Sequence, residues 1–120
     1  MIIAYWIVAG LLGLLYLFAG GKKLTQSQEQ LAPMMGWVDT VPMPAVRLIG
    51  AVEILGAAGL ILPPLTGIAP VLAIAAAAGF AVLQILAAAL HLSRGEVKET
   101  GMNVPLIILA VVAAWLATAF

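Results

Sequence analysis

The sequence predicts an all-α fold, an integral membrane bundle of four transmembrane helices, and two observations lead to this class. Of its 120 residues, 65% are hydrophobic and only 8% are charged, so the chain lacks the polar side chains that cover a soluble domain. Its apolar residues run in four stretches of about 20, the length that crosses a hydrocarbon core. A backbone in lipid must satisfy its own hydrogen bonds, and barrel strands are much shorter than these stretches, so we expect helices.

The first predicted helix covers residues 2–21 and is followed at once by Lys22 and Lys23. A cleaved signal peptide carries its basic residues before the apolar stretch, so their position here favours a retained helix. We interpret the two lysines as residues that fix the topology. The connection over residues 24–44 mixes polar and apolar side chains. We expect it to lie at the membrane interface, as an anchor or as a lid over a binding site.

The second predicted helix covers residues 45–64 and ends at Pro63 and Pro64, because proline lacks a backbone donor and stops helices. A short turn leads into the third, over residues 68–92, so these two helices form a hairpin. The fourth covers residues 104–120. Four spans bring the chain back to the side of the membrane from which it started.

All five Lys and Arg residues lie in or beside the first and third connections, whereas the turn at residues 63–67 has no charge. By the positive-inside rule we place the charged side in the cytoplasm and both termini outside it. The net charge of zero predicts no nucleic-acid partner. The absence of cysteine excludes disulfides, thiolate metal sites and thiol chemistry by this chain itself.

Polar residues inside the spans are the candidates for function, because each costs about 2.5–3.5 kcal/mol at a helix centre on insertion scales. Glu53 lies nine residues after Pro44, which places it about 13 Å along its helix and near the middle of the bilayer. Its helical neighbours Gly50, Gly56 and Ala57 are small, which favours close contact with another helix. We therefore expect Glu53 to point into the bundle.

The third helix supplies a matching polar face, because Gln84 and His91 are seven residues apart and lie on the same side. We expect Gln84 at the depth of Glu53, and His91 near Arg47 at the mouth of the bundle. The candidate ligand-binding residues are Tyr16, which shares a helix face with Lys23, together with Arg47, Glu53, Gln84, His91 and Asn103. Glu53 and His91 are the candidate catalytic residues, as an acid and a base.

Each of these residues also has a purely structural interpretation. Glu53 could bond to Gln84 or Tyr16 as a clasp between helices, and a lone Gln84 is more often a helix-contact residue than a ligand contact. His91 could be solvated at the interface, and without a second ligand it predicts no metal site. Arg47 could reach lipid phosphates.

Two stretches of the chain resemble the DoxX-like family of small membrane proteins. These are residues 18–24 and residues 47–63, the second with a Gly-x-x-Glu-x-x-Gly core around Glu53, and the positions of His91 and Asn103 fit the same pattern. The resemblance implies a four-helix bundle in the bacterial inner membrane. The family takes its name from a subunit associated with thiosulfate:quinone oxidoreduction, so the resemblance suggests a quinone as cofactor and a redox protein as partner.

Three functions remain open at this stage, and the first is our main prediction. In it the chain is a binding or accessory subunit of a membrane redox system, and its cavity takes a quinone, an isoprenoid or another lipophilic molecule. In the second it is a small enzyme, with Glu53 exchanging protons with a lipophilic substrate. In the third it is an oligomeric carrier, with a second copy of the chain in a homodimer as its partner, although its two halves lack the similarity of inverted repeats. Membrane lipid surrounds the chain in all three.

Overall fold

The computed structural model describes residues 1–120 and contains helices and turns but no strand. Its four long helices are α1 (Ile2–Thr25), α3 (Met43–Thr66), α4 (Val71–Ser93) and α5 (Thr100–Ala117). All four are long and apolar enough to cross a membrane. The predicted all-α fold with four membrane-spanning helices is therefore confirmed.

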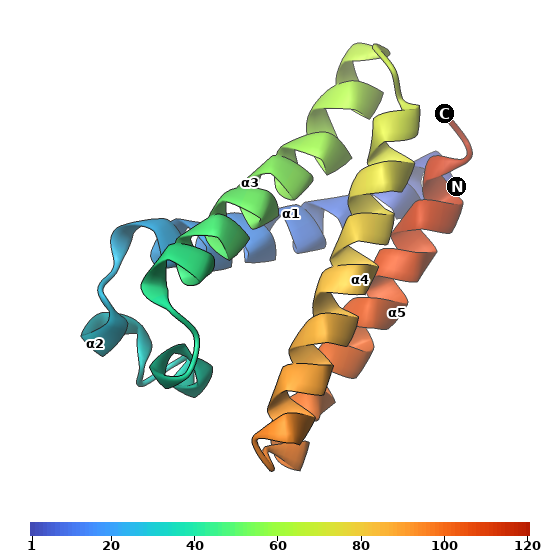
Figure 1. Ribbon diagram of the computed structural model, residues 1–120. Helices are drawn as coiled ribbons and strands as arrows, with labels where there is room; N and C mark the ends of the chain where they lie inside the picture. Colours follow the sequence, from blue (N-terminus) through green and yellow to red (C-terminus); the bar gives the residue numbers. More distant parts are fainter.

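The four helices pack as two pairs that meet at one end and diverge at the other (Figure 1). In one pair α1 packs along α3, and in the other α4 packs along α5. The pairs meet where the turn between α3 and α4 lies beside both chain termini. Only 24 of the 120 residues are buried, and large apolar side chains such as Ile3 and Leu14 are exposed on the outer helix faces. This distribution is expected of a bundle surrounded by lipid.

Two glycines bring α1 and α3 into backbone contact near the diverging end. A Cβ atom added at Gly20 would lie 2.7 Å from the carbonyl oxygen of Gly50, and one added at Gly50 would lie 2.8 Å from the Cβ of Lys23. Both distances are shorter than Cβ atoms tolerate, so only glycine allows this approach. The contact places Lys23 of α1 directly beside Glu53 of α3.

The opposite end closes around an unusual proline pair. We expected α3 to end at Pro63 and Pro64, but it continues through both prolines to Thr66. Because Pro64 has no N–H, it leaves the carbonyl of Leu60, four residues earlier, without its helical donor. The buried Tyr5 hydroxyl of α1 donates to that carbonyl and replaces the missing bond.

Aromatic side chains hold the termini together at this same end. The ring of Tyr5 packs edge to face against Trp6 and Phe120, with ring centroids 5.3 and 5.0 Å apart. Phe120 also contacts Trp6 in this way. The first and last residues of the chain therefore lie at one end of the bundle, as Figure 1 shows.

At the diverging end, the connection between α1 and α3 is folded instead of extended. It forms one turn of helix, α2 (Gln28–Leu31), and a 3₁₀ turn, η1 (Gly36–Asp39), and a second such turn, η2 (Val97–Glu99), precedes α5. Leu31 and Val38 from the connection are buried against Val46 of α3. This small core fixes the connection against the start of α3 and beside the gap between the helix pairs.

Candidate functional site

A cavity of about 650 Å³ lies between the two helix pairs at the diverging end. All four long helices line it, and the connection contributes Met34 and Trp37. Of its 22 lining residues, 13 are hydrophobic, so the cavity has apolar walls with a limited set of polar groups. Its size falls in the range of about 300–1,000 Å³ that is typical of small-molecule sites.

The deepest polar contact joins α1 to α3. The ammonium of Lys23 donates a hydrogen bond to Oε1 of Glu53, and the two side chains are only 10% and 2% exposed. The ammonium also lies 5.6 Å from the centroid of the Trp37 ring. A buried charge without a partner is destabilising, so Lys23 and Glu53 each offset the cost of burying the other's charge. Glu53 thus pairs with Lys23, and not with Gln84 or Tyr16 as in our clasp interpretation.

A second polar group is a chain of hydrogen bonds that crosses three helices. The side-chain amide of Asn103 in α5 donates through Nδ2 to Oε1 of Gln84 in α4, at 2.7 Å. Gln84 in turn donates through Nε2 to the hydroxyl of Tyr16 in α1, at 2.8 Å. The Tyr16 ring is stacked on Phe80, with centroids 3.8 Å apart and an angle of 8° between the planes. These contacts fix the positions of all three polar side chains.

One polar atom in this series of hydrogen-bonded side chains has no partner. Asn103 is only 5% exposed and lines the cavity, yet its Oδ1 has no hydrogen-bond partner. Buried polar atoms are almost always paired in proteins, so an unpaired one calls for an explanation.

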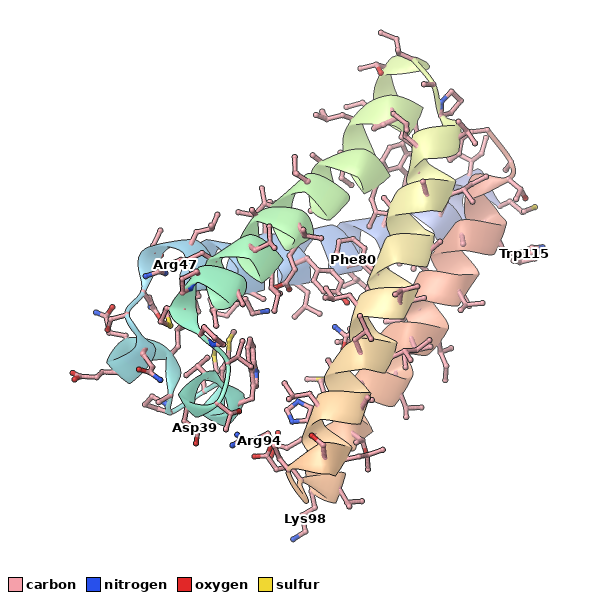
Figure 2. The ribbon with its side chains drawn as sticks, viewed as in Figure 1. Asp39, Arg47, Phe80, Arg94, Lys98 and Trp115 are labelled. Carbon is pink, nitrogen blue, oxygen red and sulfur yellow. The ribbon has the colours of Figure 1, made fainter.

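The mouth of the cavity carries a network of charged residues. His91 lies with Nδ1 3.2 Å from Oε1 of Glu96, and Arg94 donates to the same oxygen at 2.7 Å. Arg94 also donates to Oδ1 of Asp39, at 2.6 Å, and to the Thr40 hydroxyl, at 2.7 Å. Arg94 follows α4 whereas Asp39 ends η1, so the contact joins α4 to the connection across the gap (Figure 2).

Arg94 sets the electrostatics of this network. Its guanidinium, by hydrogen bonding, holds the pKa of Asp39 and the pKa of Glu96 below their ordinary values. His91 adds to the effect on Glu96 as a second hydrogen-bond partner. Both carboxylates therefore stay ionised over the whole physiological range, and the network keeps its charges there.

The structure places the six predicted ligand-binding residues in two locations. Those that line the cavity are Tyr16, Glu53, Gln84, His91 and Asn103. Arg47 is not part of the lining, because its guanidinium donates to the backbone carbonyl of Lys23 at 2.6 Å and so joins the ends of α1 and α3. Ligand binding or catalysis by any of the six stays a prediction.

The sequence analysis missed the roles of Lys23, Arg94 and Asp39 at this end of the bundle. It assigned Lys23 to topology, although Lys23 lies seven residues after Tyr16 and therefore on the same face of α1, which was the pattern that could have identified it. It used Arg94 only to assign the topology and gave no role to Asp39, although their pairing brings together residues 55 positions apart. Nothing in the local sequence of either residue indicates this contact.

The arrangement is suited to holding a molecule with an apolar body and a small polar head. The apolar walls can take up the body, while the polar groups of Glu53, Gln84 and Asn103 can orient the head. The structure has no cluster of three or more side chains that could hold a metal ion.

Comparison with known proteins gives one match. A family model described as the DoxX-like family matches residues 7–115. This range includes most of each long helix and the whole connection beside the cavity. No curated protein and no solved structure matches the chain.

Proposed function

The chain belongs to the DoxX-like family, and on that premise we propose that it is a ligand-binding or accessory subunit of a redox system in the bacterial inner membrane. Its ligand is a lipophilic molecule with a polar head, of the quinone or isoprenoid kind. The observation that carries this proposal is the cavity of about 650 Å³, with mostly apolar walls and several polar side chains from different helices. Such a combination is typical of sites for small organic ligands.

The position of Glu53 favours binding over catalysis. An acid or base must exchange its proton with the substrate, whereas the Glu53 carboxylate already accepts a hydrogen bond from the Lys23 ammonium. The other candidate, His91, is engaged with Glu96 at the mouth of the cavity. The two groups therefore serve better to position a ligand than to transform one.

The closed end of the bundle counts against a carrier. A carrier must open its site to each side of the membrane in turn. Here the end opposite the cavity is filled by the Tyr5, Trp6 and Phe120 cluster and by the Tyr5 bond to Leu60. Access from that side would require the helix pairs to separate where they are packed most closely.

We assign the charged end to the cytoplasm, because all five basic residues lie in or beside the connections at that end. The cavity then opens near the cytoplasmic surface, where a redox partner can dock against the charged connections. The chain has no cysteine, so single cysteines can report the orientation. We expect Lys98→Cys to resist a membrane-impermeant maleimide in intact cells and Ile2→Cys to react, and the reverse result would invert the topology.

Native mass spectrometry of protein purified gently from its own host tests the ligand proposal. We expect a lipophilic molecule to co-purify with the wild type and to be lost or reduced in Glu53→Gln, which weakens the polar end of the cavity. Glu29→Gln is the matched control, because Glu29 is an exposed carboxylate on α2, away from the cavity. Bulk phospholipid alone in all three proteins would contradict the proposal.

A further inference from the structure

The unpaired oxygen of Asn103 carries information about the ligand. Asn103 is 5% exposed, it lines the cavity, and its Oδ1 is fully buried without a hydrogen-bond donor. Its Nδ2 is already committed to Gln84, at 2.7 Å. The free atom is a carbonyl oxygen, so only a hydrogen-bond donor can satisfy it.

The direction of the hydrogen-bond chain leaves a free donor at its other end. Gln84 accepts from Asn103 through one atom of its amide and donates to Tyr16 through the other. The Tyr16 oxygen therefore acts as an acceptor toward Gln84, and its own proton remains to be donated. Asn103 and Tyr16 both line the cavity, and both bond to the side-chain amide of Gln84.

Glu53 adds a second acceptor to the same cavity. Lys23 bonds only to Oε1 of Glu53, and a carboxylate paired with an ammonium can accept hydrogen bonds but cannot donate them. The Lys23 ammonium itself is held between this carboxylate and the ring of Trp37. Glu53 therefore offers a further acceptor to a ligand that can donate a hydrogen bond.

We propose that the ligand head is a hydroxyl group that donates its proton to Oδ1 of Asn103, as in an isoprenoid alcohol or a hydroquinone. The oxygen of the same hydroxyl accepts the Tyr16 proton, so a single hydroxyl group pairs with both Asn103 and Tyr16. A quinone carbonyl, an aldehyde or an ether can accept from Tyr16 but leaves Asn103 unpaired. This inference rests on the lipophilic ligand proposed above and specifies the chemistry of its head.

Matched ligands test the inference on the wild-type protein. Farnesol, its methyl ether and farnesal have the same isoprenoid body and differ in whether the head can donate a hydrogen bond. We expect native mass spectrometry titrations in detergent micelles to give about tenfold tighter binding for farnesol than for either other compound. A short-chain hydroquinone compared with its quinone, kept under reducing and oxidising conditions respectively, should show the same preference. The series that binds more tightly identifies the natural class.

A variant assigns the preference to Asn103. Asn103→Leu replaces the amide with an apolar side chain of similar volume, and we expect the ratio of alcohol to ether affinity to fall from about ten to about one. Ala87→Phe is the control, because Ala87 lines the apolar wall and a larger side chain there fills space without changing the polar groups. It should weaken both ligands to the same extent and keep the ratio. Should Asn103→Leu fail to fold, the wild-type comparison still decides.

The outcomes separate this inference from the proposed function. Equal affinity for the alcohol, the ether and the aldehyde would overturn the role of Asn103 while leaving a lipophilic site in place. The same holds for tighter binding of the quinone than of the hydroquinone. If no compound of either series binds, the proposed function fails, and the inference fails with it.

Discussion

The two ends of the bundle are held together by different kinds of interaction. At the end where the helix pairs meet, the contacts are aromatic and apolar, and Tyr5 satisfies the free carbonyl of Leu60. At the end where they diverge, charged and polar side chains join different elements. Two contacts of this kind are Lys23 with Glu53 and Arg94 with Asp39. Figure 2 shows Arg94 and Asp39 close together.

This difference indicates that the two ends of the bundle have different roles. Close apolar packing at one end fixes how the pairs are joined, so the other end can diverge and enclose a cavity. Polar groups in that cavity are positioned by partners on other helices. Substitutions at the closed end should therefore change stability alone, whereas substitutions at the open end should change the cavity as well.

The largest expected effect comes from removing the partner of Glu53. Lys23→Met leaves a carboxylate that is 2% exposed without its ammonium, and we expect the free energy of unfolding to fall by about 3–5 kcal/mol. Urea unfolding in detergent micelles, followed by circular dichroism, measures the loss. Lys22→Met is the control, because the Lys22 ammonium contacts only the Phe18 ring, at 5.0 Å from its centroid.

A second variant distinguishes a broken pair from lost packing. In Lys23→Met/Glu53→Leu both charges are gone, and replacing a buried pair with apolar residues is often close to neutral. We therefore expect the double variant to recover most of the stability. A loss in Lys23→Met no greater than in Lys22→Met would show that this ion pair does not hold the open end together.

The next effect concerns the glycine contact that brings Lys23 to Glu53. Gly20→Ala places a Cβ 2.7 Å from the Gly50 carbonyl, and overpacking of this kind costs about 1–3 kcal/mol. Gly21→Ala is the matched control one residue away, because nothing lies within 4 Å of its added Cβ. We expect it to be neutral or to stabilise the helix by about 0.5–1 kcal/mol. Equal effects in the two variants would argue against backbone contact between α1 and α3.

The closed end is tested by Tyr5→Phe, which removes the hydroxyl that donates to the Leu60 carbonyl. We expect a loss of about 1–2 kcal/mol, because that buried acceptor is left unpaired, with ligand affinity unchanged. Pro64→Ala supplies the missing backbone N–H, so Tyr5→Phe should cost less in a Pro64→Ala background than alone. Thermal unfolding of the four proteins completes the cycle. An identical cost in both backgrounds would mean that the hydroxyl does not replace the proline's missing donor.

Sequence alone predicts the four helices and the inward position of Glu53, but not the partner of its carboxylate. Four apolar runs of this length form helices in lipid. The small residues around Glu53 correctly indicate a helix face that contacts another helix. The pairing of Lys23 with Glu53 depends on how α1 and α3 are rotated against each other. That rotation follows from the glycine contact and has no local sequence pattern.

The proline pair is a second case in which the local sequence does not predict the structure. A local rule ends the helix at Pro63 and Pro64, because each removes a backbone donor. The helix nevertheless continues to Thr66, and the hydroxyl of Tyr5, 55 positions from Leu60, pairs with the carbonyl that Pro64 leaves free. A rule based on neighbouring residues does not include this distant partner.

The smallest expected effect lies at the mouth of the cavity. Asp39 is 63% exposed, so its contact with Arg94 adds little to global stability, and Arg94→Gln should leave the unfolding transition almost unchanged. The variant should instead loosen the connection relative to α4. Because the chain has no cysteine, spin labels at Met34→Cys in the connection and Val97→Cys in η2, both exposed, can report the distance between the connection and the turn that follows α4. We expect a broader distance distribution in Arg94→Gln than in the labelled protein that keeps Arg94.

The pH dependence of the same distance gives the sign of the interaction. Hydrogen bonding to Arg94 lowers the pKa of Asp39 from its ordinary value of 3.8. A carboxylate with a lowered pKa in the folded state stabilises its contact above the ordinary pKa, and the contribution is lost as the pH falls through the lowered value. The distribution should therefore stay narrow from about pH 7 to about pH 4 and broaden only below that. In Arg94→Gln it should be broad throughout, and broadening already near neutral pH in the Arg94 protein would assign the mouth contact to another titrating group.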